Sequence, residues 1–503
     1  MIDLLPLIAI IDEQIKSDNG ITTEDPKKEK YLRRVREHEQ EMKLIAPKGS
    51  MEAREVTKNR ISFILSEMEK DINFNTINQI ISQYHIDYFA NIYSGGNQKA
   101  LKTPIDEEIA DYLQMFSITK HDSYETKFNK LVQIIYQELY GYSILDELIF
   151  DTTLNEVSCN RYDYITIQYK GVKRHIPNPK FKFKSNNIYE KIIRDRMLAN
   201  AQKEINRGNS MNNCILLNGY RVTATQPPLS RYFTVTVRLH TYKTAVEEDK
   251  YDELMPTTIH EAIVLLATKG RRNVGIIGEM GSGKTTAADE IIIKNIDDNV
   301  AIGLAESTHE LNLSKKYPNK NVIEFQYEGL YEPYEITAMM LRFNRDIITY
   351  GEIRTHFECF EAVKAMLRQA RGSLFTFHSS TPERTIHDMR QLLMQTGYYT
   401  DYREAQFDVA DAVDLLIQLR LDRDTGKRYV YKVAEVIASV KDMSFEVKEL
   451  FKYDKEQNRY IVNSAGISDA MITSCLEYEM NQKDIERVNW LIKETGKEPV
   501  SCT

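Results

Sequence analysis

The sequence predicts an α/β protein in which a smaller α/β domain precedes a larger domain built on a parallel sheet. From Thr257 onward, helix-like and strand-like runs alternate, which is typical of a parallel sheet covered on both faces. Before it, short strand-like runs surround one helix-like segment between residues 126 and 242. In chain order, the four strands expected first in the larger domain are 274–277, 300–304, 347–350 and 374–377.

Further elements are predicted from the same patterns. Strand-like runs at 415–419 and 429–437 flank the turn 423–427 and predict a β-hairpin. The last forty residues are expected to form helices and a frayed tail. In the smaller domain the expected elements are a helix at 127–140, a helix at 189–202, and strands at 156–159, 164–169, 214–217 and 233–239.

The chain of 503 residues is too long for one ordinary core and favours two or three domains. A charged run that ends at Pro256 predicts a linker. A charged stretch at 27–60 is interpreted as a solvated helix, with a phosphate- or lipid-binding face as the alternative. The expected division is a helical extension over 1–125, an α/β domain over 126–242, a linker over 243–256 and a nucleotide-binding domain over 257–503.

Charge and cysteine usage exclude several classes of protein. The formal net charge of −8 argues against nonspecific coating of nucleic acid. Five scattered cysteines without a C-x-x-C pair indicate neither a disulfide framework nor a zinc module, and they favour a reducing compartment. The apolar run 1–11 contains Asp3 and Pro6 and is too short to cross a bilayer, so we interpret it as a docking segment. We expect a soluble protein that works beside a membrane.

The most informative motif is the glycine-rich segment GEMGSGKTT at 278–286, which matches G-x-x-x-x-G-K-[ST] between an expected strand and an expected helix. In such a loop the glycines let successive backbone N–H groups turn inward around a phosphate, and the helix adds its positive end. Lys284 is expected at the β- and γ-phosphates, and the Thr285 hydroxyl in a Mg²⁺ shell. The residues expected to bind a nucleoside triphosphate are Gly278, Gly281, Ser282, Gly283, Lys284, Thr285 and Thr286.

Polar side chains follow the next three expected strands. Glu306 follows a strand that we expect beside the P-loop strand, and it is expected to orient water or Mg²⁺. Glu352 is expected as general base and indirect Mg²⁺ ligand, with Arg354 holding its geometry. His378 is interpreted as a γ-phosphate sensor or subunit contact rather than a metal ligand. The alternatives are an exposed acidic turn, a Glu–Arg surface pair and a structural histidine.

These motifs occur in an order that resembles the type II/type IV secretion ATPase superfamily, the hexameric motors of pilus assembly, secretion and conjugation. The P-loop is followed by the acidic box AESTHEL (305–311), GEIR (351–354) and GSLFTFH (372–378). The chain most resembles the Tad/Flp pilus assembly ATPases and the conjugative-secretion traffic ATPases, over about residues 125–460. Upstream, the segments LDEL (145–148), EVSCN (156–160), NGYRV (218–222) and TVR (236–238) carry the likeness.

The resemblance implies a RecA-like P-loop NTPase domain preceded by a smaller, PAS-like α/β domain, with ATP and Mg²⁺ bound. It implies that Glu352 is the general base and that Arg221 and Arg238 reach ATP across a domain or subunit boundary, where a permanent cation stabilises the transferring phosphoryl group. The catalytic residues implied are Glu352, Glu306, His378, Arg354, Arg221 and Arg238, with Glu310 as a second acidic-box carboxylate.

The chain departs from the family pattern at several positions. Ser307 stands where the acidic box usually has Asp, and Arg345 replaces a common proline before Asp346. One extra residue lies between GEIR and the histidine box, and the paired C-x-x-C module of the type II branch is absent from the sequence. The first 125 residues have no counterpart and are expected to carry partner specificity.

The expected function is a hexameric ATPase motor that powers pilus assembly or protein secretion at the cytoplasmic face of a membrane, with an integral-membrane platform protein as partner. One alternative is a ring-shaped DNA translocase of a conjugation system, which the acidic charge and the lack of an aromatic and basic channel motif oppose. The other is a nucleotide-binding scaffold with weak hydrolysis, which Ser307 keeps open.

Overall fold

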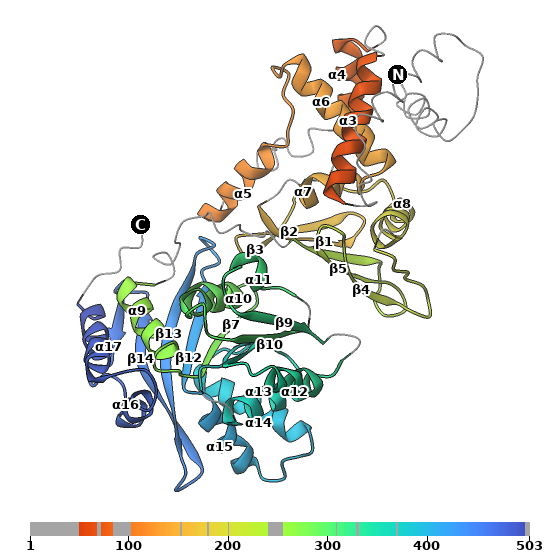
Figure 1. Cartoon of the computed structure of the whole chain (residues 1–503). Coiled ribbons are helices and arrows are strands. Elements are labelled where there is room, and N and C mark those ends of the chain that lie inside the picture. Colours follow the sequence, from red (N-terminus) through yellow and green to blue (C-terminus); the bar gives the residue numbers. More distant parts are fainter. Residues whose placement is uncertain are drawn as a thin grey trace. The chain divides into compact units, whose positions relative to one another are not determined.

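The computed structural model is described over residues 50–67, 72–83, 102–150, 153–178, 181–199, 201–239, 255–307, 309–327, 331–368 and 371–497 (Figure 1). The chain divides into two compact units, residues 1–242 and 243–503, and each is treated by itself below. The expected docking segment 1–11, the charged stretch up to residue 49 and linker residues 243–254 lie outside the described residues, so those expectations stay predictions.

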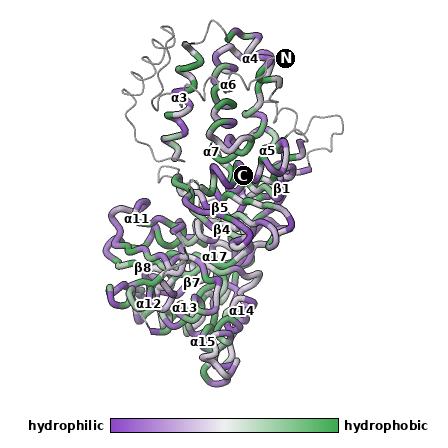
Figure 2. The backbone as a smooth tube through the Cα atoms, turned by 90° about the vertical axis from the view of Figure 1, so that its right-hand side faces the viewer, coloured by the Kyte–Doolittle hydropathy of each residue, from purple (hydrophilic) through white to green (hydrophobic). Residues whose placement is uncertain are grey.

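Three helices of the first unit, α3 (Met51–Glu67), α4 (Phe74–Gln83) and α6 (Tyr124–Leu139), pack around one apolar cluster. Figure 2 shows hydrophobic and hydrophilic residues interleaved along these helices, as expected for amphipathic helices with one buried face. Helix α6 begins where the Ser123 side chain accepts a hydrogen bond from the Thr126 N–H. Helix α5 (Pro104–Gln114) begins in the same way at Thr103. The helix expected at 127–140 is therefore confirmed.

A buried ion pair joins α3 to the segment that precedes the first strand. Arg54 Nε donates to Asp146 Oδ2 at 3.2 Å, and both side chains are almost fully buried. Gln133 Nε2 on α6 donates to the same oxygen at 3.0 Å. Asp146 opens the short helix α7 (Asp146–Phe150), so the charge pair connects three helices in one small core.

The first unit also contains a six-stranded antiparallel sheet with the order β3-β2-β1-β6-β5-β4. Its strands are β1 (Leu154–Arg161), β2 (Tyr164–Tyr169), β3 (Val172–His175), β4 (Met211–Ile215), β5 (Arg221–Thr225) and β6 (Thr234–Arg238). Helix α8 (Asn186–Ile192) continues as a wider helical turn to Leu198. The expected strands are present, with the one expected at 214–217 beginning earlier. β3 and β5 were not predicted because they are short and largely polar.

The second unit is built on a nine-stranded sheet with the order β15-β14-β13-β12-β7-β11-β10-β8-β9. The strands from β12 to β9 in this order run parallel, and β13, β14 and β15 extend the sheet antiparallel. The strands are β7 (Val274–Gly278), β8 (Ile302–Glu306), β9 (Val322–Gln326), β10 (Ile347–Ile353), β11 (Leu374–Phe377), β12 (Leu415–Leu421), β13 (Arg428–Ser439), β14 (Ser444–Asp454) and β15 (Arg459–Val462). The α/β class, the RecA-like P-loop arrangement and the β12–β13 hairpin are confirmed.

One expected neighbour relation is wrong. The strand that delivers Glu306, β8, was expected beside the P-loop strand β7, but β11 and β10 lie between them. The reason is that β11, although late in the chain, pairs with β7 on one side and β10 on the other. Glu306 is therefore three strands away from the P-loop strand, and His378, at the end of β11, is the nearest of the predicted polar groups in strand order.

Helices cover both faces of this sheet, as predicted for parallel strands. Val274 and Ile276 point into a cluster with α9 (Thr257–Ala267), α16 (Asp469–Leu476) and α17 (Gln482–Thr495); α9 and α17 lie side by side in Figure 1. Ile277 points into the opposite cluster, with α12 (Pro333–Arg342), α13 (His356–Arg368), α14 (Pro382–Gln395) and α15 (Tyr402–Ala412). The remaining helices are α10 (Lys284–Ala287), which continues as tighter and wider turns to Asn295, and α11 (Leu313–Lys316). Among the described helices, none is both long and apolar enough to cross a membrane.

Candidate active site

The predicted phosphate-binding loop connects β7 to α10. Residues 278–283 form the turn, Lys284 and Thr285 open the helix, and Lys284 is buried whereas Thr286 is exposed. Lys284 Nζ donates to the carbonyl oxygens of Glu279 at 3.1 Å and Gly278 at 3.3 Å. Burial lowers the pKa of Lys284 to about 8, and the negative charge of Glu352 only partly opposes this shift. Because a nearby phosphate would favour the charged ammonium, this lysine is suited to an anionic ligand.

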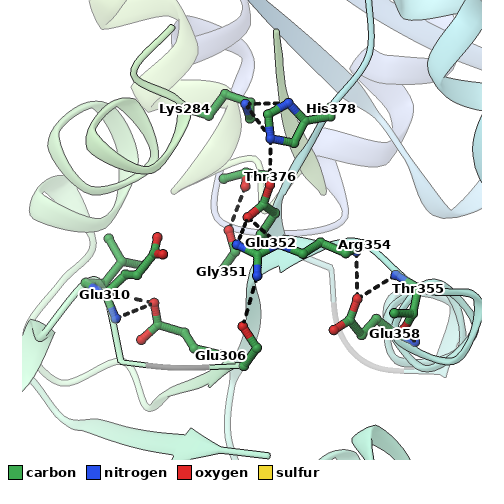
Figure 3. A network of polar contacts seen from close by, with 12 residues as sticks. Lys284, Glu306, Glu310, Gly351, Glu352, Arg354, Thr355, Glu358, Thr376 and His378 are labelled. Carbon is green, nitrogen blue, oxygen red and sulfur yellow. Dashed lines mark hydrogen bonds and ion pairs between the residues drawn. The ribbon is translucent and has the colours of Figure 1, made fainter. Parts of the chain in front are cut away.

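His378 connects Lys284 to Glu352 (Figure 3). Lys284 Nζ lies 3.2 Å from His378 Nδ1, and His378 Nε2 lies 2.8 Å from Glu352 Oε1. The other carboxylate oxygen of Glu352 accepts hydrogen bonds from Arg354, whose Nε is 2.7 Å away. Burial alone would raise the pKa of Glu352, but the hydrogen bonds from His378 and Arg354 and the charge of Arg354 outweigh it and lower the pKa to about 2. Both oxygens of the predicted general base are thus engaged by cationic or hydrogen-bonding side chains.

Glu306 has the opposite electrostatic environment. Its side chain is only 4% exposed at the end of β8, and Oε1 accepts the backbone N–H groups of Glu310 and Leu311 at 3.1 and 3.2 Å. Oε2 accepts no hydrogen bond from the described residues and lies 3.9 Å from His309 Nδ1. Burial raises the pKa of Glu306 to about 7, against the effect of the two N–H donors. This carboxyl group is therefore a much better proton acceptor near neutral pH than Glu352.

Gly351 allows Glu306 to sit where it does. A Cβ atom at position 351 would lie 2.8 Å from Glu306 Cγ, which is closer than real Cβ contacts allow. Thr376 Oγ1, on β11, donates to the Gly351 carbonyl at 2.6 Å. The acidic box, the GEIR segment and the histidine strand are consequently in direct contact at one edge of the sheet (Figure 3).

A carboxylate that the sequence analysis missed holds the segment after Glu352. Glu358 Oε2 accepts the backbone N–H groups of Arg354 at 2.6 Å and Thr355 at 2.7 Å, and Oε1 accepts the Tyr327 hydroxyl at 2.9 Å. Arg354 NH1 also donates to Ser307 Oγ at 3.4 Å, so the serine that replaces the usual aspartate is a hydrogen-bond partner of this arginine. The sequence signal that could have identified Glu358 is its position, since it is an acidic residue four positions after Arg354 of the GEIR segment.

The two predicted arginines of the first unit lie beside one another but are not placed relative to the P-loop. Arg221 on β5 and Arg238 on β6 are direct cross-strand partners. Arg238 Nε lies 3.5 Å from Glu156 Oε2, and its side chain is 43% exposed. Because the P-loop belongs to the second unit, the approach of these arginines to ATP stays a prediction.

Asp346 lies at the opposite end of β10 from Glu352, where its Oδ2 accepts the Ala301 N–H at 2.8 Å.

The residues of the second unit fit a nucleotide with Mg²⁺. A glycine loop with a buried lysine, the half-buried Thr285 and the buried Oε2 of Glu306, which accepts no hydrogen bond from the described residues, supply a cation, a hydroxyl ligand and a carboxylate at one sheet edge. Carboxyl ends of parallel strands are where open α/β sheets bind ligands. Six of the predicted site residues lie at this edge of the sheet, namely Lys284, Thr285, Glu306, Glu352, Arg354 and His378.

A protein-family model and several known proteins are similar to this chain. A model of the family described as Type II/IV secretion system protein matches residues 158–483. Conjugal transfer protein TrbB of Rhizobium radiobacter is 24% identical over 224 residues, which are 44% of this chain and 65% of that protein. Type IV secretion system protein VirB11 of Bartonella quintana (strain Toulouse) is 29% identical over 178 residues, 34% of this chain and 47% of that protein. The chain thus spans less than two thirds of the length of either relative.

Among solved structures, the VirB11 ATPase from the Brucella suis type IV secretion system, crystallised in complex with sulphate, is similar to this chain. The sequences are 18% identical, the TM-score is 0.32, and the match covers 58% of this chain and 93% of that one.

Proposed function

The chain belongs to the type II/IV secretion system protein family, and on that premise we propose that it is an ATPase motor that powers pilus assembly or protein secretion. One observation supports the proposal most strongly. Contacts at the carboxyl ends of neighbouring strands join Lys284 to His378 and His378 to Glu352. A P-loop alone indicates nucleotide binding. A half-buried acid, Glu352, linked to the loop lysine through His378 adds a group that acts on the attacking water.

In the proposed reaction, Lys284 leaves the carbonyl oxygens of its own loop for the phosphates of ATP, and its contact with His378 is lost. Glu352 then exchanges its His378 contact for the attacking water and polarises it, while Arg354 keeps the other carboxylate oxygen in place. Thr285 is the residue that would hold Mg²⁺, which neutralises phosphate charge when bound. Glu306 supplies a second carboxyl group that exchanges a proton near neutral pH.

Motor action also needs elements outside the second unit. We propose that Arg221 and Arg238 stabilise the transferring phosphoryl group from the first unit of the same or a neighbouring chain, which links closure of the site to hydrolysis. We further propose a homo-oligomer, with a hexamer as the expected form, at the cytoplasmic face of a membrane and bound to an integral-membrane platform protein. The extension over 1–125 is proposed to carry specificity for that partner.

Two other functions are set against this one. The engagement of both Glu352 oxygens and the presence of Ser307 favour a nucleotide-binding scaffold with weak hydrolysis. One relative is a conjugal transfer protein, which favours a translocase that acts on DNA. Turnover that rises with added DNA and falls steeply with salt would support the translocase.

The test compares Mg-ATP hydrolysis and Mg-ATP binding by the parent chain, Glu352→Gln and Lys284→Ala. We expect Glu352→Gln to bind Mg-ATP like the parent but to lose turnover, because only a transition-state interaction is removed. Lys284→Ala is expected to bind weakly. The matched control is Glu477→Gln, which changes an exposed carboxylate of the same unit. Equal turnover in Glu352→Gln and parent would remove Glu352 from the mechanism, and binding without turnover in the parent would favour the scaffold.

A further inference from the structure

The β12–β13 hairpin contacts the outer side of the P-loop, a contact that the sequence analysis did not anticipate. Arg428, the first residue of β13, donates from Nε to the carbonyl oxygen of Gly281 at 2.9 Å. In the hairpin turn, Arg423 NH2 lies 2.6 Å from Glu279 Oε2. The second pair is exposed at both ends and contributes little on its own. Arg428 is half-buried, and burial lowers the pKa of its guanidinium, which remains charged at neutral pH.

The carbonyl that Arg428 holds belongs to the peptide between Gly281 and Ser282. A trans peptide is planar, so its C=O and its N–H point in opposite directions. With the Gly281 oxygen toward Arg428, the Ser282 N–H points back into the loop, 3.3 Å from the Glu279 carbonyl oxygen. A flip of this peptide would turn a carbonyl oxygen inward, toward the phosphates, and replace a hydrogen-bond donor by a repelling acceptor.

Glycines make such a flip easy unless another group prevents it. Gly281 has a φ of 79° and Gly283 a φ of 90°, in the left-handed region where glycine is unrestrained by a side chain. Position 283 also provides the space that Arg428 needs, because a Cβ there would lie 2.8 Å from Arg428 Cδ. The same absence of side chains that lets the loop surround a phosphate therefore leaves the orientation of this peptide to its hydrogen bonds, one from the Ser282 N–H to the Glu279 carbonyl inside the loop and one from Arg428 outside it.

We propose that Arg428 is a positioning residue that keeps the 281–282 peptide in the orientation that binds phosphate. The proposal rests on the proposed function for the importance of that orientation, but the restraint itself is a property of the chain without nucleotide. A charged donor on a neutral carbonyl forms one of the stronger protein hydrogen bonds, so losing it should free this peptide measurably.

The first experiment measures amide hydrogen exchange in the full chain without nucleotide, for the parent, Arg428→Met and Arg420→Met. Arg420 is the matched control, because it is an exposed arginine of the same hairpin whose guanidinium lies over the Tyr431 ring. We expect exchange of the 278–285 segment to become about tenfold faster in Arg428→Met only, since a hydrogen bond to a charged group is lost. Unchanged exchange in a folded Arg428→Met would overturn the proposal.

The second experiment measures Mg-ATP affinity and turnover in the same variants and in Arg428→Lys. We expect Arg428→Met to weaken affinity by about tenfold with little change in turnover at saturation, and Arg428→Lys to restore part of the affinity through its remaining cation. A merely structural arginine would lower the melting temperature without this split. If the parent binds no Mg-ATP, the proposed function fails, and the exchange experiment still decides the role of Arg428.

Discussion

Replacing Glu306 by glutamine should stabilise the second unit while it impairs turnover. The parent side chain is buried, and burial raises its pKa from an ordinary 4.5 to about 7. A carboxyl group whose pKa is higher in the folded than in the unfolded state stabilises the fold at pH values below its unfolded-state pKa. That stabilisation is lost as the pH rises through the folded-state pKa. The cost of the buried charge in the parent therefore grows between pH 4.5 and about 7. Glutamine keeps an oxygen for the N–H groups of Glu310 and Leu311 but carries no charge.

The magnitude follows from the same two values. The shift in the pKa of Glu306 from 4.5 to about 7 lowers the unfolding free energy of the parent by about 3 kcal/mol at pH 8. At pH 5, where the parent carboxyl is mostly protonated, it lowers the unfolding free energy by about 1 kcal/mol. Glu306→Gln should therefore exceed the parent in unfolding free energy by roughly 2 kcal/mol more at pH 8 than at pH 5.

The assay is denaturant unfolding at the two pH values, followed by the fluorescence of Trp490. This residue is the single tryptophan of the chain and lies in α17, so its signal reports the second unit. Glu477→Gln, an exposed change in the same unit, is the control and should show no such pH dependence. A Glu306→Gln variant that is less stable than the parent at pH 8, or a difference that does not vary with pH, would refute the reasoning.

Three further predictions concern other contacts. Gly351→Ala should lower turnover and destabilise the second unit by about 1–3 kcal/mol, because the new Cβ would meet Glu306 Cγ; Trp490 unfolding checks it. Arg54→Met should destabilise the first unit by about 3–5 kcal/mol, measured by calorimetry, because Asp146 stays buried without its cation; an unchanged transition would contradict this. Arg238→Ala should reduce turnover with Mg-ATP affinity largely intact, and unchanged turnover would remove Arg238 from the active site.

The sequence predicts the groups of the candidate site better than it predicts their neighbours. The P-loop, Glu306, Glu352 and His378 follow apolar runs, and each run is a parallel strand of one sheet. That information is local, because a buried strand and the polar residue after it are adjacent in the chain. Their convergence at one sheet edge then follows from the parallel direction of the strands.

Strand order could not be predicted in the same way. The insertion of β11 between β7 and β10 depends on pairing between β11 and β7, which lie about a hundred residues apart in the chain, and this pairing leaves no periodic pattern. The contact of Arg428 with the P-loop is likewise long-range, because it joins residues 147 positions apart. The contact of Glu358 with the GEIR backbone is local, because Glu358 follows Arg354 by four positions. Strands β3 and β5 were not predicted, because each is short and contains too few apolar residues to show a strand pattern.

The position of His378 between a cation and an anion restricts which side chains can replace it. Lys284 is a donor and needs an acceptor at Nδ1, whereas Glu352 needs a donor at Nε2, and only one neutral tautomer of imidazole offers both. Asparagine and glutamine also carry a donor and an acceptor on one planar group, while arginine carries donors only and leucine carries neither. Few residue types can therefore replace His378. The requirement is a hydrogen-bond acceptor toward Lys284 and a donor toward Glu352, rather than a particular size or charge.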